Sequence, residues 1–300
     1  MGKDIHRMKL IVGRILLCLL FAVGSLAAAE GKTIRLLTIG NSFSRDATRY
    51  LPDLVKAGGH ELIHRPIVVG GASLQLHAEK AATNGLYASG RSLRQELESE
   101  PWDYVTIQQA SIKSHDIATY RPFAEQLRDY IKKYAPSATL LVHQTWAYRC
   151  DDPRFRAPSS KSGEPRTQAE MYAGLKNAYR AIAAELGARL IPVGNAFYLA
   201  DTDPRWGYRP DTAFDFKNAT PPALPHQHHS LHIGWRWKDG KLGMDGHHAS
   251  VAGQYLGACV WYETLYGESV VGNRFAPPGL DADDVRFLQE TAHRAVKANE

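Results

Sequence analysis

IRLLTIGNSFSRDATRYL, residues 34 to 51, opens with an apolar run and passes through Gly40, Asn41 and Ser42 into a segment with helical spacing. An apolar run of this length predicts a buried strand, and the residues after it predict a helix. A strand that leads straight into a helix is typical of a parallel α/β sheet, whose ligands bind at the carboxyl ends of the strands. The stretch therefore predicts that the hydroxyl of Ser42 lies at the edge of the sheet where a functional site is expected.

Four further runs of β type follow along the chain, and segments with helical spacing separate them. Because strands and helices alternate, we expect a parallel sheet with helices on both faces. The five expected strands cover residues 34–39, 63–69, 104–107, 139–143 and 189–192. The spacing of apolar residues predicts helices over 47–55, 123–131 and 171–186.

The first 29 residues have the features of a secretory signal peptide: basic residues, an apolar run over 15–27, and small residues near Ala29. The uninterrupted apolar part is shorter than the roughly 20 residues that span a bilayer. We therefore expect a secreted or periplasmic protein with no membrane span in its mature form, an uncleaved anchor being the alternative. Residues 30–300 are expected to form a single domain, in which 150–166 and 201–243 are long surface insertions.

Composition and charge narrow the class of protein. Hydrophobic residues make up 44% of the chain and charged residues 22%, as in globular domains. Residues 1–29 contain four basic residues and one acidic residue, so their removal lowers the formal net charge from +5 to +2. No nucleic-acid partner is expected at that charge. Only Cys150 and Cys259 lie beyond residue 29, which excludes a disulfide scaffold and leaves open whether the two pair.

Ser42 has two interpretations. Serine at the start of a helix commonly caps it, and Ser42 or Ser44 could do so. As a nucleophile, serine needs a histidine base that a carboxylate orients. The stretch MDGHHAS offers Asp245 and His248, three residues apart in an expected glycine-containing turn before a helix that Ser250 caps and Gly267 ends. The neighbouring His247 is a competitor, although only one residue separates it from the carboxylate.

A serine hydrolase also needs donors for the oxyanion that forms on the substrate. The backbone N–H of Ser42 is one candidate. Gly70 and Gly71 follow the second expected strand and could each present an N–H without a side chain in the way. Gln108 and Gln109 end the third strand, and two amides after an apolar run are unusual enough to suggest a role at the same edge.

Several other residues near the strand ends are candidates for substrate binding or for the core. Asn41 precedes the serine, and His143 and Trp146 follow the fourth strand, where they could line a pocket or pack internally. A cluster of histidines is expected to form a solvated loop, because it has no cysteine at the spacing typical of zinc sites; its members are His226, His228, His229 and His232. No metal site is expected.

The order of these motifs resembles the SGNH (GDSL-type) hydrolase superfamily over the whole mature chain. Gly40-Asn41-Ser42 matches the Gly-Asp-Ser block with Asn in place of Asp, and Gly70 or Gly71 matches the second-block glycine. The pair Asp245 and His248 matches the fourth block. The third block departs from the usual Gly-x-Asn-Asp: the chain has QQAS, which is similar to the glutamine-bearing block of sialate and carbohydrate acetylesterases. IGNSFS, GGASL, TIQQAS, HQTWAY, IPVGNAF and DGHHAS together resemble a bacterial SGNH-like branch known mostly as a domain of unknown function.

This resemblance implies a three-layer α/β/α sandwich with a five-stranded parallel sheet of flavodoxin type. It implies a serine hydrolase that acts on ester bonds, with no cofactor, and the signal peptide adds that this hydrolase is secreted. The substrate would be a small-molecule or glycan ester, with an O-acetyl group on carbohydrate as the leading candidate for an exported protein; peptide, lipid and thioester substrates stay open. The alternative is a non-catalytic sugar-binding protein on the same fold, in which Ser42 only caps the helix.

Overall fold

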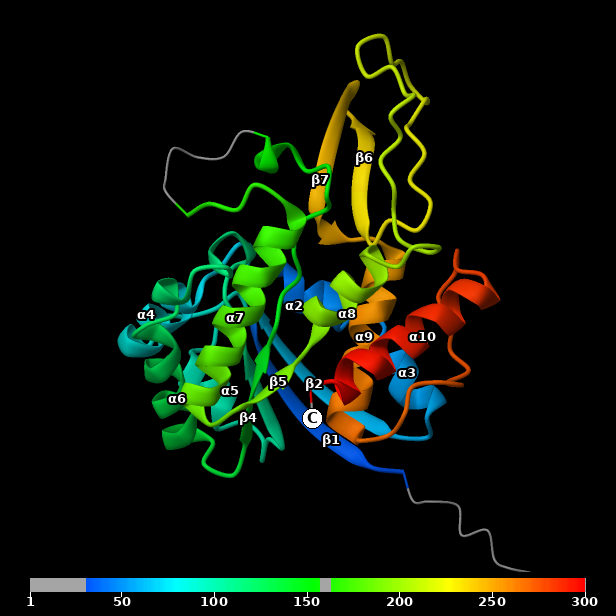
Figure 1. Cartoon of the computed structure of the whole chain (residues 1–300). Coiled ribbons are helices and arrows are strands. Elements are labelled where there is room, and N and C mark those ends of the chain that lie inside the picture. The colour runs from blue at the N-terminus through cyan, green and yellow to red at the C-terminus, as the bar shows by residue number, and fades with distance from the viewer. Residues whose placement is uncertain (1–30, 157–162, 300) are drawn as a thin grey trace, which may run out of the picture. The chain divides into compact units, whose positions relative to one another are not determined.

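Five parallel strands form the central sheet in a computed structural model that describes residues 31–156 and 163–299 (Figure 1). The strands lie in the order β2-β1-β3-β4-β5, and every neighbouring pair is parallel. They are β1 (Thr33–Gly40), β2 (Glu61–Val68), β3 (Tyr104–Ile107), β4 (Thr139–His143) and β5 (Arg189–Ile191). All five predicted strands are confirmed, with boundaries shifted by at most two residues.

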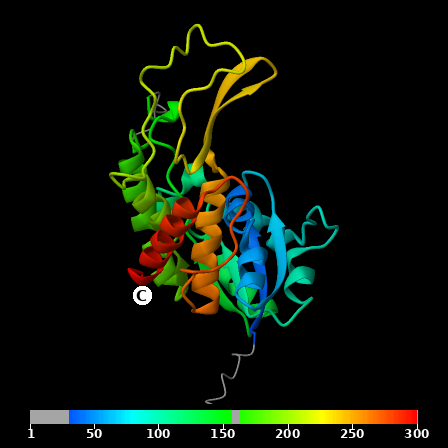
Figure 2. The same cartoon turned by 90° about the vertical axis from the view of Figure 1, so that its right-hand side faces the viewer.

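Helices cover both faces of this sheet, as expected (Figures 1 and 2). One face carries α2 (Ser42–Ala47), α3 (Leu51–Ala57), α8 (Val193–Asp201), α9 (Val251–Tyr266) and α10 (Ala282–Lys297). The other face carries α4 (Leu74–Thr83), α5 (Leu93–Leu97), α6 (Phe123–Tyr134) and α7 (Gln168–Leu186). Short 3₁₀ helices are η1 (Ser111–Lys113), η2 (Ile117–Thr119) and η3 (Pro153–Phe155). The protein is therefore a three-layer α/β/α sandwich with the strand order of flavodoxin.

The helix predicted over 47–55 is divided into α2 and α3. Pro52 is the reason: it has no N–H to donate, and its ring collides with the carbonyl four residues earlier in a continuous helix. At the second position of α3 the same proline is tolerated, because the first N–H groups of a helix have no partner within it. The helices predicted over 123–131 and 171–186 are confirmed, and so is the helix from the Ser250 cap to Gly267.

An antiparallel hairpin forms a separate two-stranded sheet from β6 (His232–Lys238) and β7 (Lys241–Ala249). It extends away from the helical layers at the top of the view in Figure 1. Asp239 and Gly240 both have positive φ, 50° and 70°, as the tight hairpin turn between right-twisted strands requires. The predicted surface insertion over 201–243 is thus wrong for its last part, and Asp245 and His248 lie on a strand rather than in a turn.

Residues 32–300 form one compact unit, and the predicted signal peptide lies outside the described residues. Within the described ranges no helix is long and apolar enough to cross a membrane. Cys259 is buried in α9 and Cys150 is exposed, and neither forms a disulfide in this part of the chain.

Candidate active site

Asn41, rather than Ser42, caps helix α2. Its side-chain oxygen accepts a hydrogen bond from the N–H of Phe43 at 2.9 Å, and its amide nitrogen donates to the carbonyl of Ala72 at 2.8 Å. The second bond ties the helix start to the loop after β2. Because Asn41 satisfies the cap, the hydroxyl of Ser42 is left for another partner. Ser42 follows β1, and β2 and β3 lie on the two sides of β1 in the sheet. The strand order therefore reverses at β1, and α/β proteins bind ligands at the carboxyl ends of the strands at such a point.

The partner of the Ser42 hydroxyl is His248. The distance from its Nε2 to Ser42 Oγ is 3.0 Å, and its Nδ1 lies 3.2 Å from both carboxylate oxygens of Asp245. The backbone N–H of His248 donates to the same carboxylate at 3.1 Å. A proton on Nδ1, held by Asp245, leaves Nε2 free to accept the serine proton. Ser42, predicted from its place between a strand and a helix, and Asp245 and His248, predicted from their spacing, therefore lie in one chain of hydrogen bonds, in the geometry of a serine nucleophile and its base.

An irregularity in the hairpin brings Asp245 and His248 together. His232 pairs with Ala249 and Gly234 pairs with Asp245. An advance of two residues along β6 therefore corresponds to an advance of four residues along β7. In a regular strand, residues three apart point to opposite faces of the sheet. The two extra residues of β7 form a bulge, and bulges re-aim side chains in this way.

Buried Arg149 anchors this irregular part of the hairpin to the loop after β4. Its guanidinium donates to Gln227 at 2.8 Å and to Ser230 at 3.1 Å, and its backbone N–H donates to the carbonyl of Gly246 at 2.8 Å. Gly234 has a φ of +72°, and a Cβ there would lie 2.1 Å from the guanidinium. A side chain at position 234 would therefore displace the anchor.

The carboxylate of Asp245 and the protonated ring of His248 stabilise each other. Burial disfavours the ionised form of Asp245, but hydrogen bonds from the ring and backbone of His248 outweigh burial and lower the pKa of the carboxyl below its usual range. The same hydrogen bond raises the pKa of His248 above 6.5, against partial burial of the ring. The guanidinium of Arg236 adds a contact of 3.2 Å to the outer oxygen of Asp245. The carboxylate is thus ionised and fixed at neutral pH.

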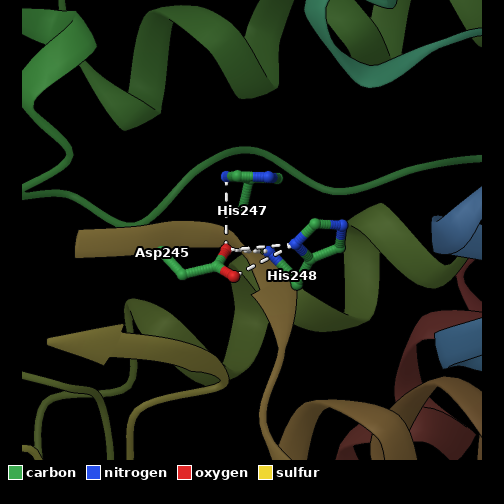
Figure 3. Close-up of side chains that lie close together, drawn as sticks. All are labelled: Asp245, His247 and His248. Atoms are coloured by element: carbon green, nitrogen blue, oxygen red, sulfur yellow. Dashed lines mark hydrogen bonds and ion pairs between the residues drawn. The ribbon is translucent and has the colours of Figure 1, made fainter. Parts of the chain in front are cut away.

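His247 also contacts Asp245, with its Nδ1 at 3.3 Å from one oxygen. Figure 3 shows both imidazole rings turned toward the carboxylate. Burial lowers the pKa of His247, in contrast to the raised pKa of its neighbour. Within the described residues only His248 makes a hydrogen bond to the hydroxyl of Ser42, so the geometry favours His248 as the base.

Asp245, His247 and His248 are also a set of side chains that could hold a metal ion, since one ligand atom from each lies within 4.8 Å of the others. One carboxylate and two imidazoles is a donor set that zinc accepts. A metal bound to Nδ1 of His248 would replace the hydrogen bond that aligns the ring with Ser42. Metal binding and the serine–histidine arrangement therefore exclude each other.

An open pocket of about 330 Å³ adjoins Ser42 and His248. Its wall is formed by Asn41, Ser42, Phe43, Gly71, Ala110, Ser111, Ile112, Tyr148, Arg154, His247 and His248. Asn41 and Gly71 are thus placed as expected. Gly70, Gln108, Gln109, His143 and Trp146 are not part of this wall.

Gln108 lies beneath the site, which differs from its expected position on the pocket surface. Its amide nitrogen donates to the side-chain oxygen of Asn41 at 2.8 Å, and its amide oxygen accepts from the Ser44 hydroxyl. Nδ1 of His143 lies 3.2 Å from the same oxygen. The residue is 1% exposed, so its amide is used to hold Asn41 and reaches no ligand in this arrangement. Burial lowers the pKa of His143 to about 3, which keeps the ring neutral.

Gln109 is likewise engaged within the protein. Its oxygen accepts from the N–H groups of Leu74 and Ala110, at 3.2 and 2.8 Å, and its nitrogen donates to the carbonyl of Thr119 at 2.8 Å. A fully buried amide with all these partners links α4 to the loop after β3. It has no free donor for an oxyanion.

Trp146 belongs to the core. Its ring lies 4.4 Å from the rings of both Phe43 and Phe197, and its Nε1 donates to the carbonyl of His247 at 2.9 Å. Trp146 therefore supports the base from below and does not meet a ligand. In the histidine cluster, His229 stacks on Trp206, and the buried ring of His232 bonds the carbonyl of Ala147.

Two features of the site were not predicted from the sequence. Asp46, four residues after Ser42, accepts the backbone N–H of Ala249 at 3.2 Å and so joins α2 to the end of β7. Arg154 and Tyr148 form a wall of the pocket from the loop after β4. The predicted insertion over 150–166 indicated a loop at this edge but not its side chains.

Comparison with known proteins agrees with this architecture. Residues 35–204 match the family model described as Domain of unknown function (DUF4886). A DUF4886 family protein from Bacteroides uniformis has 28% identity over 88% of this chain and 95% of its own, with a TM-score of 0.68. A protein from Slackia heliotrinireducens assigned to the SGNH hydrolases has 24% identity over 78% of this chain and 99% of its own, with a TM-score of 0.50. No curated protein matches the chain. Since the family model covers more than half of the sequence, the chain belongs to the DUF4886 family, a branch with the SGNH hydrolase fold.

Proposed function

We propose that this protein is a serine hydrolase that cleaves ester bonds, with Ser42 as the nucleophile, His248 as base and acid, and Asp245 as the group that orients His248. The observation that carries the proposal is the pair of contacts on one imidazole: 3.0 Å from Nε2 to the serine hydroxyl and 3.2 Å from Nδ1 to the carboxylate. A serine that only capped the helix would have no use for such a histidine, and Asn41 already fills the cap.

In the first half of the reaction, Ser42 Oγ attacks the ester carbonyl carbon while His248 Nε2 takes the hydroxyl proton. The C–O bond to the leaving alcohol then breaks, and the alcohol oxygen receives that proton from His248. In the second half, His248 takes a proton from water, the hydroxide oxygen attacks the acyl carbon, and the proton returns to Ser42 as the carboxylic acid leaves. Asp245 keeps its charge throughout and stabilises the imidazolium.

The oxyanion would be held by the backbone N–H groups of Ser42 and Gly71. Both residues line the pocket, and neither N–H has a hydrogen-bond acceptor within the described part of the chain. Gly71 has a φ of +68°, a conformation that glycine adopts without strain. Gln108 serves this arrangement indirectly, because it holds Asn41 and Asn41 in turn holds the carbonyl of Ala72 beside Gly71.

For the substrate, we propose an O-acetyl group on a carbohydrate, cleaved outside the cytoplasm after export through residues 1–29. The pocket is open and small, which suits a short acyl group on a ring that remains partly in solvent. The basic and apolar pattern of residues 1–29 supports export.

Labelling with a fluorophosphonate, followed by peptide mapping, tests the proposal. The label should be found on Ser42 and not on Ser44, whose hydroxyl is buried against Gln108. Ser42→Ala should remove the label and reduce 4-nitrophenyl acetate hydrolysis by about 10³-fold or more, with an unchanged circular dichroism spectrum. A folded wild-type protein with neither label nor turnover would overturn the proposal and favour the sugar-binding alternative.

A further inference from the structure

The pocket beside Ser42 has one fixed cation on its wall and no carboxylate. Among its lining residues only Arg154 carries a charge at all pH values of interest, and none is aspartate or glutamate. Asp245 lies behind His247 and His248 and is already in contact with both, and with Arg236. Asp46 is not part of the pocket wall and bonds the backbone of β7. The surface that a substrate meets is therefore positive.

The guanidinium of Arg154 makes no ion pair with a carboxylate in residues 31–156 and 163–299, although exposed arginines elsewhere in the chain do. Its nearest acidic neighbour in sequence, Asp152, is buried and accepts the backbone N–H of Arg154 at 2.9 Å. That bond caps η3 and fixes the backbone of the arginine, but it does not neutralise the guanidinium.

The side chain of Arg154 is nevertheless held in place. Its guanidinium carbon lies 4.9 Å from the ring centroid of Tyr148, a cation–π contact. Tyr148 is itself fixed, since it is buried and its hydroxyl lies 3.1 Å from the Ser111 hydroxyl. A guanidinium that is held in place on a pocket wall and has no carboxylate partner in the described residues is suited to a carboxylate, which arginine binds through two parallel hydrogen bonds.

We propose that Arg154 binds a carboxylate of the substrate, so that the preferred esters carry an anionic group close to the scissile bond. This inference rests on the proposed hydrolase function of the same pocket. The carboxylate has two possible sources: the alcohol part, as in an O-acetylated uronic acid, or the acyl part, as in the half-ester of a dicarboxylic acid. Both place the same anion against the same guanidinium.

Two matched pairs of esters distinguish these sources. The first pair is O-acetylated glucuronic acid and O-acetylated glucose, and the second is mono-4-nitrophenyl succinate and 4-nitrophenyl butyrate. In at least one pair the anionic ester should have the higher kcat/KM. Arg154→Gln should reduce the ratio of anionic to neutral kcat/KM about ten-fold or more, as expected for the loss of a charge-assisted hydrogen bond. Arg154→Lys should keep part of the preference, and added salt should weaken it.

Arg156→Gln is the matched control, because Arg156 is exposed and lies two residues away but is not on the pocket wall. It should keep the ratio of the wild type. The absence of a preference in both pairs, or a preference that survives Arg154→Gln, would overturn the inference while leaving Ser42-dependent hydrolysis of neutral esters intact.

A binding measurement separates this inference from the proposed function. Calorimetry with the Ser42→Ala variant should show that glucuronate or succinate binds more tightly than glucose, and that Arg154→Gln in the same background removes the difference. This result would stand even if no ester were hydrolysed. Equal binding of the three compounds, together with no anionic preference in turnover, would reject the role of Arg154.

Discussion

Asp46 accepts a hydrogen bond from the backbone N–H of Ala249 at 3.2 Å, and this bond joins the helix that carries Ser42 to the residue that follows His248. The carboxyl group is buried, and burial raises its pKa despite the backbone hydrogen bond. The proposed nucleophile Ser42 and the proposed base His248 are 206 residues apart in the sequence. We infer that Asp46 is a positioning residue, which fixes the distance between these two side chains.

Replacement of Asp46 tests this role. Asp46→Ala leaves the buried N–H of Ala249 without an acceptor, which should cost about 1–3 kcal/mol in the free energy of unfolding. We also expect kcat for 4-nitrophenyl acetate to fall about ten-fold, with KM less affected, because the base moves relative to Ser42. Asp46→Asn keeps an acceptor and should restore most of kcat. Wild-type kcat in a folded Asp46→Ala protein would contradict the role.

The two adjacent histidines should differ in their effect on catalysis. His248→Ala should abolish ester hydrolysis, since only this ring reaches Ser42. His247→Ala should leave most of kcat, although it removes a ring from the pocket wall and can change KM. Steady-state kinetics on the two variants decide the matter. Loss of activity in His247→Ala with retained activity in His248→Ala would assign the base to His247. The bond between Asp245 and His248 would then have no role in catalysis.

Activity should decline on the acidic side of neutrality. His248 must be neutral to accept a proton, and its hydrogen bond to Asp245 raises its pKa above 6.5. As the pH falls through this raised pKa, the base becomes protonated and kcat/KM falls. Asp245→Asn removes the stabilising charge, so the acidic limb should move to lower pH while the maximal rate drops. A pH–rate profile measures both, and a wild-type limb well below pH 6.5 would be inconsistent with the geometry.

Gln108 should affect kcat through Asn41. Gln108→Ala removes hydrogen bonds to Asn41 and Ser44 in a buried region and should lower the free energy of unfolding by about 1–3 kcal/mol. We expect kcat to fall as Asn41 and the loop beside Gly71 lose their alignment, whereas KM stays nearly constant because Gln108 is absent from the pocket wall. A rise in KM alone would instead show direct contact with substrate.

The central sheet could be predicted from the sequence because the inner strands are short apolar runs that are largely buried, each followed by a helix signal. The edge strand β2 is only partly buried, and its predicted bounds were shifted by up to two residues. The spacing of Asp245 and His248 also sufficed to select a carboxylate and an imidazole that bond each other, the imidazole lying 3.0 Å from the hydroxyl of Ser42. The hairpin was missed, although its signal was present: Asp239-Gly240 is a typical two-residue turn between strands. Prolines and histidines before it favoured a loop.

The orientation of the glutamines could not be derived in the same way. A position at the end of β3 identifies Gln108 and Gln109 as residues of the site region, but the direction of each amide depends on partners far apart in sequence, such as Asn41 and Thr119. The bulge in β7 has the same origin. Pairing between His232 and Ala249 sets the register of the hairpin at the bulge. The sequence of β7 alone does not predict this pairing.

The separate hairpin has a consequence for how the proposed activity would be lost. Asp245 and His248 lie on a two-stranded ribbon that shares no backbone ladder with the five-stranded sheet, and such ribbons have little stability of their own. Hydrogen bonds join β7 to the sandwich at three successive places: Gly246 accepts from the backbone N–H of Arg149, His247 accepts from the ring of Trp146, and Ala249 donates to Asp46. Partial opening of this ribbon would move His248 and Asp245 away from Ser42 while the α/β/α sandwich stayed folded. Under rising denaturant, inactivation should therefore precede the loss of helical circular dichroism, and the protein would pass through a folded but inert form.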